Sequence, residues 1–214
     1  MTRRNAKQKK THGSSKSLKR KSLGLPPKPR ILIVCEGAET EPKYLNRLRR
    51  ELRLSKDLLK IVGGDLGGSN PKSLAEYARE KNIAAHQERF SYDEVWCVFD
   101  RDQHTRIEEA FIQIRDNNFK SAFSNPSFEL WFLLHFQNQT ASIERRVVLR
   151  ELKKHLRNYE KSLDVYDDLK PKQADAIERA RNLRKNCTAS GTVPECPYTN
   201  VDELLQSISK AYTK

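Results

Sequence analysis

Apolar runs alternate with helical patterns along the first two thirds of the chain. The runs 31–35 and 95–99 are continuous and rich in β-branched and aromatic residues, which is typical of strands covered on both faces. Weaker runs at 58–62 and 119–123 predict two more strands. Apolar residues at helical spacing follow each run, beginning near residues 42, 71, 107 and 126. This alternation predicts an α/β fold whose parallel strands are joined by right-handed crossovers.

From about residue 140 onward the pattern predicts helices only. Apolar residues at helical spacing mark three of them, around residues 149–156, 174–183 and 201–208. We therefore expect one domain over residues 30–214. Its α/β core, 30–139, would hold a parallel four-stranded sheet flanked by helices, and residues 140–214 would form a helical layer on that core.

Basic charge is concentrated at the N-terminus. Residues 1–30 hold eleven Lys and Arg and no Asp or Glu, whereas the rest of the chain holds thirty basic and twenty-eight acidic residues, so the formal net charge of +13 belongs mainly to this segment. Residues 1–29 are also rich in Ser, Thr and Gly, and we expect them to be disordered. Such a tail can bind nucleic-acid phosphates non-specifically, which we favour, or simply aid solubility.

Several classes of protein are excluded by the sequence. No apolar run approaches the roughly 18 residues that a membrane helix needs, and the basic N-terminus lacks the hydrophobic segment of a secretory signal. Four cysteines do not make a disulfide framework at this length, and Cys35 and Cys97 lie within apolar runs, as buried thiols do. We expect a cytoplasmic protein without a membrane segment.

Acidic residues follow directly on the two clearest predicted strands. Glu36 follows the run 31–35, and Asp100, Arg101 and Asp102 follow the run 95–99. In open parallel sheets, ligands bind outside the carboxyl ends of the strands. Carboxylates gathered there suit a hard cation such as Mg²⁺ or Mn²⁺. The pattern therefore favours phosphoryl chemistry at a site formed by Glu36, Asp100 and Asp102.

Two further glutamates can join this site. Glu41 lies in the first helical turn after Glu36, where it can be a metal ligand or a partner of the helix dipole. The dipole alone explains the neighbouring Glu39 better. Glu129 stands at the start of the apolar helix that follows the fourth predicted strand, and the same two explanations apply to it. For Glu129 we favour the metal site.

Four other polar residues are candidates for substrate binding, namely Arg101, His104, Ser124 and Asn125. Arg101 can contact a phosphate or neutralise its acidic neighbours. His104 can act as a general base or phosphate donor, although a solvated loop histidine is the simpler explanation. Ser124 and Asn125 can donate hydrogen bonds to a phosphate or cap the helix that follows them.

Three motifs closely resemble those of the RloB family. They are Val34-Cys35-Glu36-Gly37 with Thr40-Glu41-Pro42, the segment from Tyr92 to Asp102, and Ser124-Asn125-Pro126 followed by Phe128-Glu129-Leu130-Trp131. The stretch Thr199-Asn200-Val201 is similar to the end of that family. The resemblance spans about residues 30–208 and leaves out the basic tail.

This resemblance implies a fold and a set of residue roles. RloB-like proteins include the second component of the AbiL abortive-infection system and are related to the TOPRIM domain of topoisomerases, primases and overcoming-lysogenization-defect nucleases. A TOPRIM-like fold is therefore expected. Glu36 would be a general acid/base or metal ligand, and Asp100 and Asp102 would bind Mg²⁺ or Mn²⁺. Glu129 and Glu41 would complete a two-metal arrangement.

The resemblance also implies an activity. No tyrosine is placed by these motifs as a strand-passing nucleophile, so the expected reaction is hydrolysis of phosphodiesters in RNA or DNA. The protein would be the toxic effector of an antiphage defence system, controlled by a separately encoded ATPase, since the chain has no Walker motif. The alternative is a non-catalytic component that binds nucleic acid or that ATPase. The sequence leaves open whether the chain forms a homo-oligomer.

Overall fold

A five-stranded sheet organises the chain. The computed structural model describes residues 28–64, 71–101, 106–187, 193–194 and 197–213. The strands lie in the order β2-β1-β3-β4-β5. Their bounds are β1 Ile31–Cys35, β2 Leu59–Gly63, β3 Glu94–Asp100, β4 Lys120–Asn125 and β5 Tyr198–Thr199.

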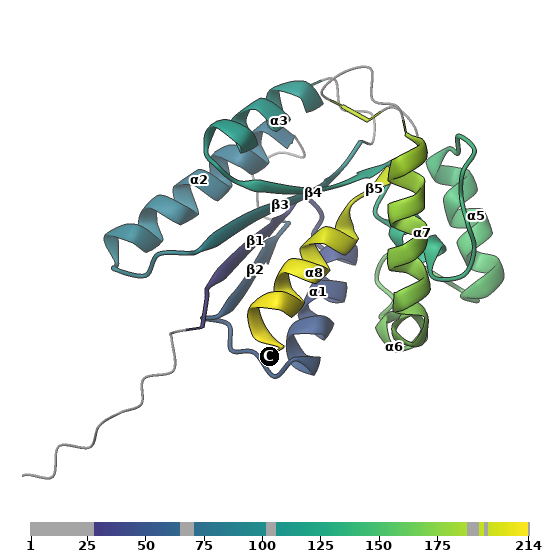
Figure 1. The fold of residues 1–214 in the computed structure, drawn as a ribbon, viewed down its shortest axis with the longest axis horizontal. Coiled ribbons are helices and arrows are strands. Elements are labelled where there is room, and N and C mark those ends of the chain that lie inside the picture. Colours follow the sequence, from purple (N-terminus) through teal and green to yellow (C-terminus); the bar gives the residue numbers. More distant parts are fainter. Residues whose placement is uncertain (1–27, 65–70, 102–105, 188–192, 195–196, 214) are drawn as a thin grey trace, which may run out of the picture.

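Helices cover both faces of this sheet and one of its ends. The α-helices are α1 Thr40–Glu51, α2 Pro71–Gln87, α3 Ile107–Asp116, α4 Glu129–Leu134, α5 Arg145–His155, α6 Tyr166–Leu169, α7 Gln173–Asn186 and α8 Val201–Tyr212, and Lys170–Lys172 forms a 3-10 turn. In Figure 1, α2 and α3 lie on one face of the sheet and α1 and α8 on the other, while α5, α6 and α7 gather beside β5. The expected α/β fold with flanking helices is confirmed.

The four predicted strands are present, but the sheet is larger than predicted. Strands β2, β1, β3 and β4 pair in parallel, and β5 adds to β4 in the antiparallel sense. A two-residue strand has no hydrophobic run to reveal it. Its place is fixed by Asn200, whose Oδ1 accepts a hydrogen bond from Phe123 N at 2.7 Å and whose Nδ2 donates to Ser121 O at 3.0 Å.

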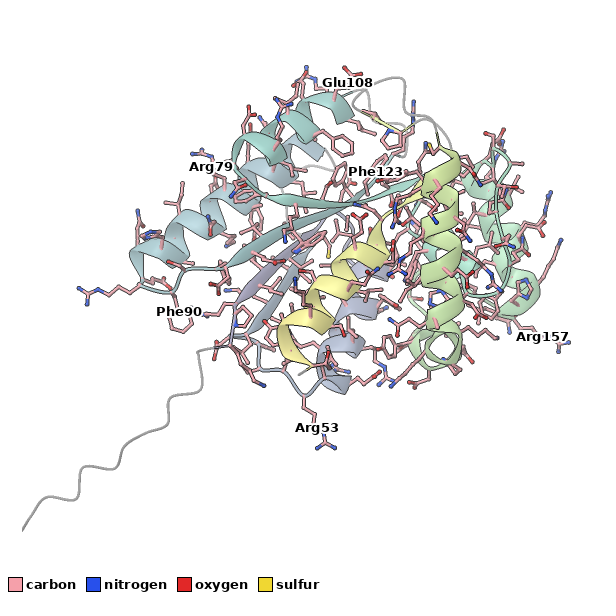
Figure 2. The ribbon with its side chains drawn as sticks, in the orientation of Figure 1. Arg53, Arg79, Phe90, Glu108, Phe123 and Arg157 are labelled. Atoms are coloured by element: carbon pink, nitrogen blue, oxygen red, sulfur yellow. The ribbon has the colours of Figure 1, made fainter. Side chains whose placement is uncertain are left out.

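Apolar side chains form one layer on each face of the sheet. Along β1, Ile31, Ile33 and Cys35 pack in the layer that includes α1 and α8, and Leu32 and Val34 pack in the layer that includes α2 and α3. Because both faces are covered, all five residues of β1 are buried, as its continuous apolar sequence predicts. Figure 2 labels Phe123 of β4, whose ring meets those of Phe99 and Phe111 in the second layer.

The C-terminal third is helical, as predicted, with two differences. Helix α6 and the 3-10 turn after it were not predicted, because a four-residue segment shows no helical period. Helix α4 is only six residues long, shorter than the predicted 126–136. All six of its residues are buried, since α5 and α7 pack around it.

Two sets of polar contacts hold the two ends of α8 to the rest of the domain. Asp202 of α8 is fully buried and forms a two-armed ion pair with Arg184 of α7, which also donates to Thr199 O at 2.7 Å. At the other end of α8, the hydroxyl of Tyr212 lies 2.7 Å from the carbonyl oxygens of both Pro29 and Leu58. The last helix is thereby fixed to the start of β1.

Cys35 and Cys97 are buried thiols, as predicted. Within the described residues, no helix combines the length and apolar character needed to cross a bilayer. The N-terminal tail up to residue 27 lies outside the described residues.

Replacing Asp202 with Asn should destabilise the fold. The change keeps the shape of the side chain but leaves the charge of Arg184 without its buried partner, which typically costs about 3 kcal/mol or more. Urea denaturation measures this loss. As a control, Arg181→Ala removes an exposed α7 side chain that bonds Gln206 and should change the free energy of unfolding by less than about 0.5 kcal/mol. Equal effects of the two substitutions would contradict a stabilising role of the ion pair.

Candidate functional site

Glu36 and Asp100 meet at the carboxyl ends of neighbouring strands. Glu36 follows β1, and its backbone N–H still donates to Val98 O of β3 at 2.9 Å. Its side chain turns toward the end of β3, where Oε2 accepts a hydrogen bond from Asp100 N at 3.4 Å. Two residues separated by 64 positions are therefore in direct contact at one edge of the sheet.

Glu41 enters the same region from the first turn of α1. Its side chain is buried, and its carboxylate lies against Gly37. A Cβ atom at residue 37 would stand 2.9 Å from Glu41 Cδ, which is closer than real Cβ atoms come. A side chain at residue 37 would therefore displace the Glu41 carboxylate, whereas the backbone φ of Gly37 is not among the positive values and sets no demand for glycine.

Glu129 is the first residue of α4 and is almost completely buried. Its Oε2 accepts a hydrogen bond of 2.6 Å from the hydroxyl of Ser127. Helix α4 starts directly after β4, the strand that pairs with β3. The edge of the sheet thus receives carboxylates from two strand ends and two helix starts.

These four carboxylates line one pocket of about 360 Å³. Two basic residues from the C-terminal third, Arg145 and Lys161, line it as well. The pocket is lined by Glu36, Gly37, Ala38, Glu39, Thr40, Glu41, Asp100, Phe128, Glu129, Arg145 and Lys161.

Burial and the repulsion of neighbouring charges raise the pKa of two of these carboxylates, Asp100 and Glu41. Burial raises the pKa of Asp100 well above its ordinary value, and the negative charges of Glu41 and Glu129 raise it further. The backbone of Phe128 and the charge of Arg145 act in the opposite direction. These two favourable contacts are not enough to offset the burial of a charged carboxylate.

Glu41 is affected in the same way. Burial, followed by the charges of Glu129 and Glu36, raises the pKa of Glu41 from 4.5 to about 7, although its own backbone hydrogen bond and Lys161 lower it. At neutral pH about half of the Glu41 side chains therefore carry a proton. Either protons or a cation can relieve the repulsion among these groups.

The chemistry of the pocket suits a hard divalent cation, but its geometry is not that of a closed metal site. Carboxylate oxygens are the ligands that Mg²⁺ and Mn²⁺ prefer. Asp100 Oδ1 is buried and has no hydrogen-bond partner among the described residues. In that same part of the chain, however, no three His, Cys, Asp or Glu side chains are arranged to hold a metal ion. Asp102, the other expected ligand, lies outside the described residues, and so does His104.

Three expected substrate-binding residues lie away from the pocket. Arg101 Nη1 donates to Pro194 O at 3.4 Å, and Asn125 Nδ2 donates to the same carbonyl oxygen at 3.0 Å. The hydroxyl of Ser124 is buried and bonds that of Thr199 at 3.0 Å. In the described structure these side chains fasten the ends of β3 and β4 to the segment around β5. No side-chain cap is present at α4.

Sequence reasoning missed Arg145, Lys161 and Ser127. The two cations lie in a region rich in basic residues, where no local pattern separates them from exposed neighbours. Ser127 belongs to the segment Ser124–Glu129 that contains the expected Glu129, and its position two residues before a buried glutamate is the only signal that could have identified it.

Comparison with known proteins agrees with these features. No curated protein and no solved structure matches the chain. The family model described as RloB-like protein matches residues 31–208, which include all five strands, the acidic pocket and most of α8. The chain belongs to the RloB-like protein family.

Proposed function

We propose that this protein is a Mg²⁺- or Mn²⁺-dependent nuclease that hydrolyses phosphodiesters of RNA or DNA. The observation that carries the proposal is the convergence of Glu36, Glu41, Asp100 and Glu129 on one pocket at the carboxyl ends of parallel strands. This arrangement is the one expected of a TOPRIM-like sheet, and membership of the RloB-like family supports the same reaction.

A bound cation is the simplest means by which this pocket could accept a phosphodiester at neutral pH. A cluster of carboxylates repels a phosphodiester, and protonation would relieve the repulsion only by removing the charges. The residues that would hold the ion are Asp100, Glu129 and Glu36, together with Asp102 from outside the described residues. When bound, such an ion lowers the pKa of water and stabilises charge on the reacting oxygens.

The other residues of the pocket suit the remaining tasks. Glu41, which is buried in the first turn of α1 beside the other carboxylates, is suited to accept a proton from the attacking water. Arg145 and Lys161 offer positive charge on the rim of the pocket, where they can bind the phosphate. Ser127 keeps the carboxylate of Glu129 in place.

The proposed biological role comes from the family. We propose a toxic effector in an abortive-infection system, with an ATPase partner encoded separately. A second function is favoured by a specific observation, the lack of a three-ligand arrangement among the described acidic, His and Cys side chains. On that reading the protein is a non-catalytic component that binds nucleic acid or the ATPase.

Metal binding separates these two functions. We expect isothermal titration calorimetry at pH 8 to detect Mn²⁺ or Mg²⁺ binding to the full chain. Asp100→Asn should weaken that binding at least tenfold, because it removes a ligand charge while keeping the side-chain shape. Asp116→Asn, which changes an exposed carboxylate paired with Arg115, should bind as the wild type does. Absence of binding to the wild type would favour the non-catalytic function.

Cleavage is tested with total RNA, plasmid DNA and single-stranded oligonucleotides, each with Mn²⁺. We expect at least one substrate to be cut, and Glu36→Gln to slow the cut by about 10²-fold or more, the usual effect of losing an acid/base group or ligand. Glu108→Gln, a change at an exposed α3 residue, serves as the control. Cleavage that Glu36→Gln leaves unchanged would place the reaction elsewhere or in a contaminant.

The raised pKa of Glu41 predicts a pH dependence of stability. Between about pH 4.5 and 7 the folded state keeps a proton that the unfolded state has released, so the free energy of unfolding falls as pH rises through this range. The loss attributable to Glu41 is on the order of 1–3 kcal/mol. Glu41→Gln should flatten the decline, and Glu108→Gln should not. Urea denaturation at several pH values measures the free energy of unfolding. If this free energy falls equally steeply with pH in the wild type and in Glu41→Gln, the decline does not come from Glu41.

A further inference from the structure

Two basic pockets flank the edge strand β2. The first, between α1 and β2, has a volume of about 770 Å³ and is lined by the cations Lys43, Arg47, Arg49, Arg50, Lys56 and Lys60 against two acidic residues. The second, beside α2, has a volume of about 310 Å³. Strand β2 pairs only with β1 in the described sheet, so it is an edge strand there, and its exposed residue Lys60 lines both pockets.

The pockets form one continuous surface that reaches the acidic pocket. Lys56, Asp57 and Lys60 line both basic pockets. At its other end, the α1 pocket shares Ala38 with the acidic pocket. We name this surface, from Ala38 past Lys60 to Phe90, the β2 track. It leads from the carboxylates along the edge of the sheet.

Some of the cations on the track are already engaged. Arg47 pairs with Asp164 and Asp167. Arg49 is buried and donates to Leu59 O at 3.4 Å, and its pKa is lowered by burial and by the charge of Arg50. These arginines shape the track and add to its positive potential.

Three other cations are available to a ligand. Arg50, Lys56 and Lys60 are exposed and have no ion pair or hydrogen bond with another described side chain. Lysines on edge strands commonly prevent association with other sheets, which would explain Lys60. Arg50 and Lys56 lie outside the strand, so that explanation does not extend to them.

The far end of the track carries aromatic rings. The guanidinium of Arg30 lies 3.3 Å from the ring centroid of Phe90 and 5.7 Å from that of Tyr92. Its Nε donates to Asp57 O at 3.2 Å, which fixes the orientation of the planar group. Phe90 is nevertheless 46% exposed, so part of its ring is accessible to a ligand. Stacked aromatic and guanidinium planes beside a basic groove are how proteins hold unpaired bases.

We propose that the β2 track binds single-stranded nucleic acid and leads it into the acidic pocket. The backbone phosphates lie against Arg50, Lys56 and Lys60, and a base stacks on the surface formed by Phe90, Arg30 and Tyr92. The inference rests on the proposed function in one respect, that the bound strand is the substrate. The binding itself requires no metal and no cleavage.

The test measures binding of fluorescein-labelled 20-residue oligouridylate and oligothymidylate to the full chain by fluorescence anisotropy, with EDTA present. The triple variant Arg50→Glu, Lys56→Glu, Lys60→Glu should bind at least tenfold more weakly. Its binding should also depend less on salt. The slope of log K against log salt should become shallower by about two, because each of the three lost phosphate contacts contributes about 0.7. The two probes also show whether the strand is RNA or DNA.

A matched control removes the same charge elsewhere. Lys153→Glu, Arg157→Glu and Lys185→Glu change three exposed cations, and Arg157 lies at the opposite side of the molecule from Phe90 (Figure 2). This variant should lose less than threefold in affinity. Equal losses in the two triple variants would overturn the proposal, because binding would then depend only on net charge. The neutral triple Arg50→Gln, Lys56→Gln, Lys60→Gln, with urea denaturation of each protein, excludes unfolding as the cause.

A second variant tests the stacking surface. Phe90→Ala should weaken binding of the single strand about fivefold or more and leave binding of a duplex of the same length unchanged. If single strand and duplex are affected alike, or neither is affected, the preference for single strands is wrong.

The outcome can be read independently of the nuclease proposal. If the track variants lose binding in EDTA but the wild type neither binds Mn²⁺ nor cuts any substrate, the track is correct and the nuclease is not. If the wild type cuts and the track variants bind and cut normally, the nuclease is correct and the track is not.

Discussion

The parallel pairing of β1 with β3 is the constraint on which the acidic pocket depends. Its register sets Cys35 beside Val98, so Glu36 and Asp100 leave the sheet at the same edge. The hydrogen bond from Asp100 N to Glu36 then joins the two strand ends directly. Helices α1 and α4 begin at this edge too, and they bring Glu41 and Glu129 with them. The four acids meet because β1, β3 and β4 are neighbours in the sheet. Each acid lies at the end of one of these strands or at the start of the helix that follows it.

Burying these acids together is unfavourable, and the structure offsets it only in part. Burial and neighbouring negative charges raise the pKa of Asp100 and Glu41, while Arg145, Lys161 and the backbone around Phe128 oppose the effect. The stability of the domain comes from elsewhere, chiefly the two apolar layers on the sheet. A rigid sheet can therefore hold a group of mutually repelling carboxylates that would separate on a flexible loop. This is the usual relation between a stable fold and a strained functional site.

The sequence predicts the parts of the fold that are locally encoded. Strands β1 and β3 are continuous apolar runs because both of their faces are covered, and Glu36 and Asp100, which the same pattern singles out, lie at one edge of the sheet. Strand β5 was missed because it is only two residues long and is defined by its pairing with Ser124 and Asn125 of β4, more than seventy residues away.

The basic side of the pocket was missed for a related reason. Arg145 reaches the acids only after α5 has packed on α4, and nothing in its local sequence shows this. Ser124 and Asn125 stand in a motif that suggests phosphate binding, but their side chains bond Thr199 and Pro194 in the folded chain.

The contact of Tyr212 with Pro29 and Leu58 sets where the N-terminal tail departs from the domain. The segment 1–28 joins the domain beside Arg30, which lines the α2 pocket, and its sequence holds ten basic residues. Under the proposed binding of single strands, two weak binding elements joined in this way would each raise the local concentration of the ligand for the other, and their affinities would multiply rather than add. A protein so arranged would retain a long polyanion for many rebinding events, while every single contact would remain weak enough for that chain to slide.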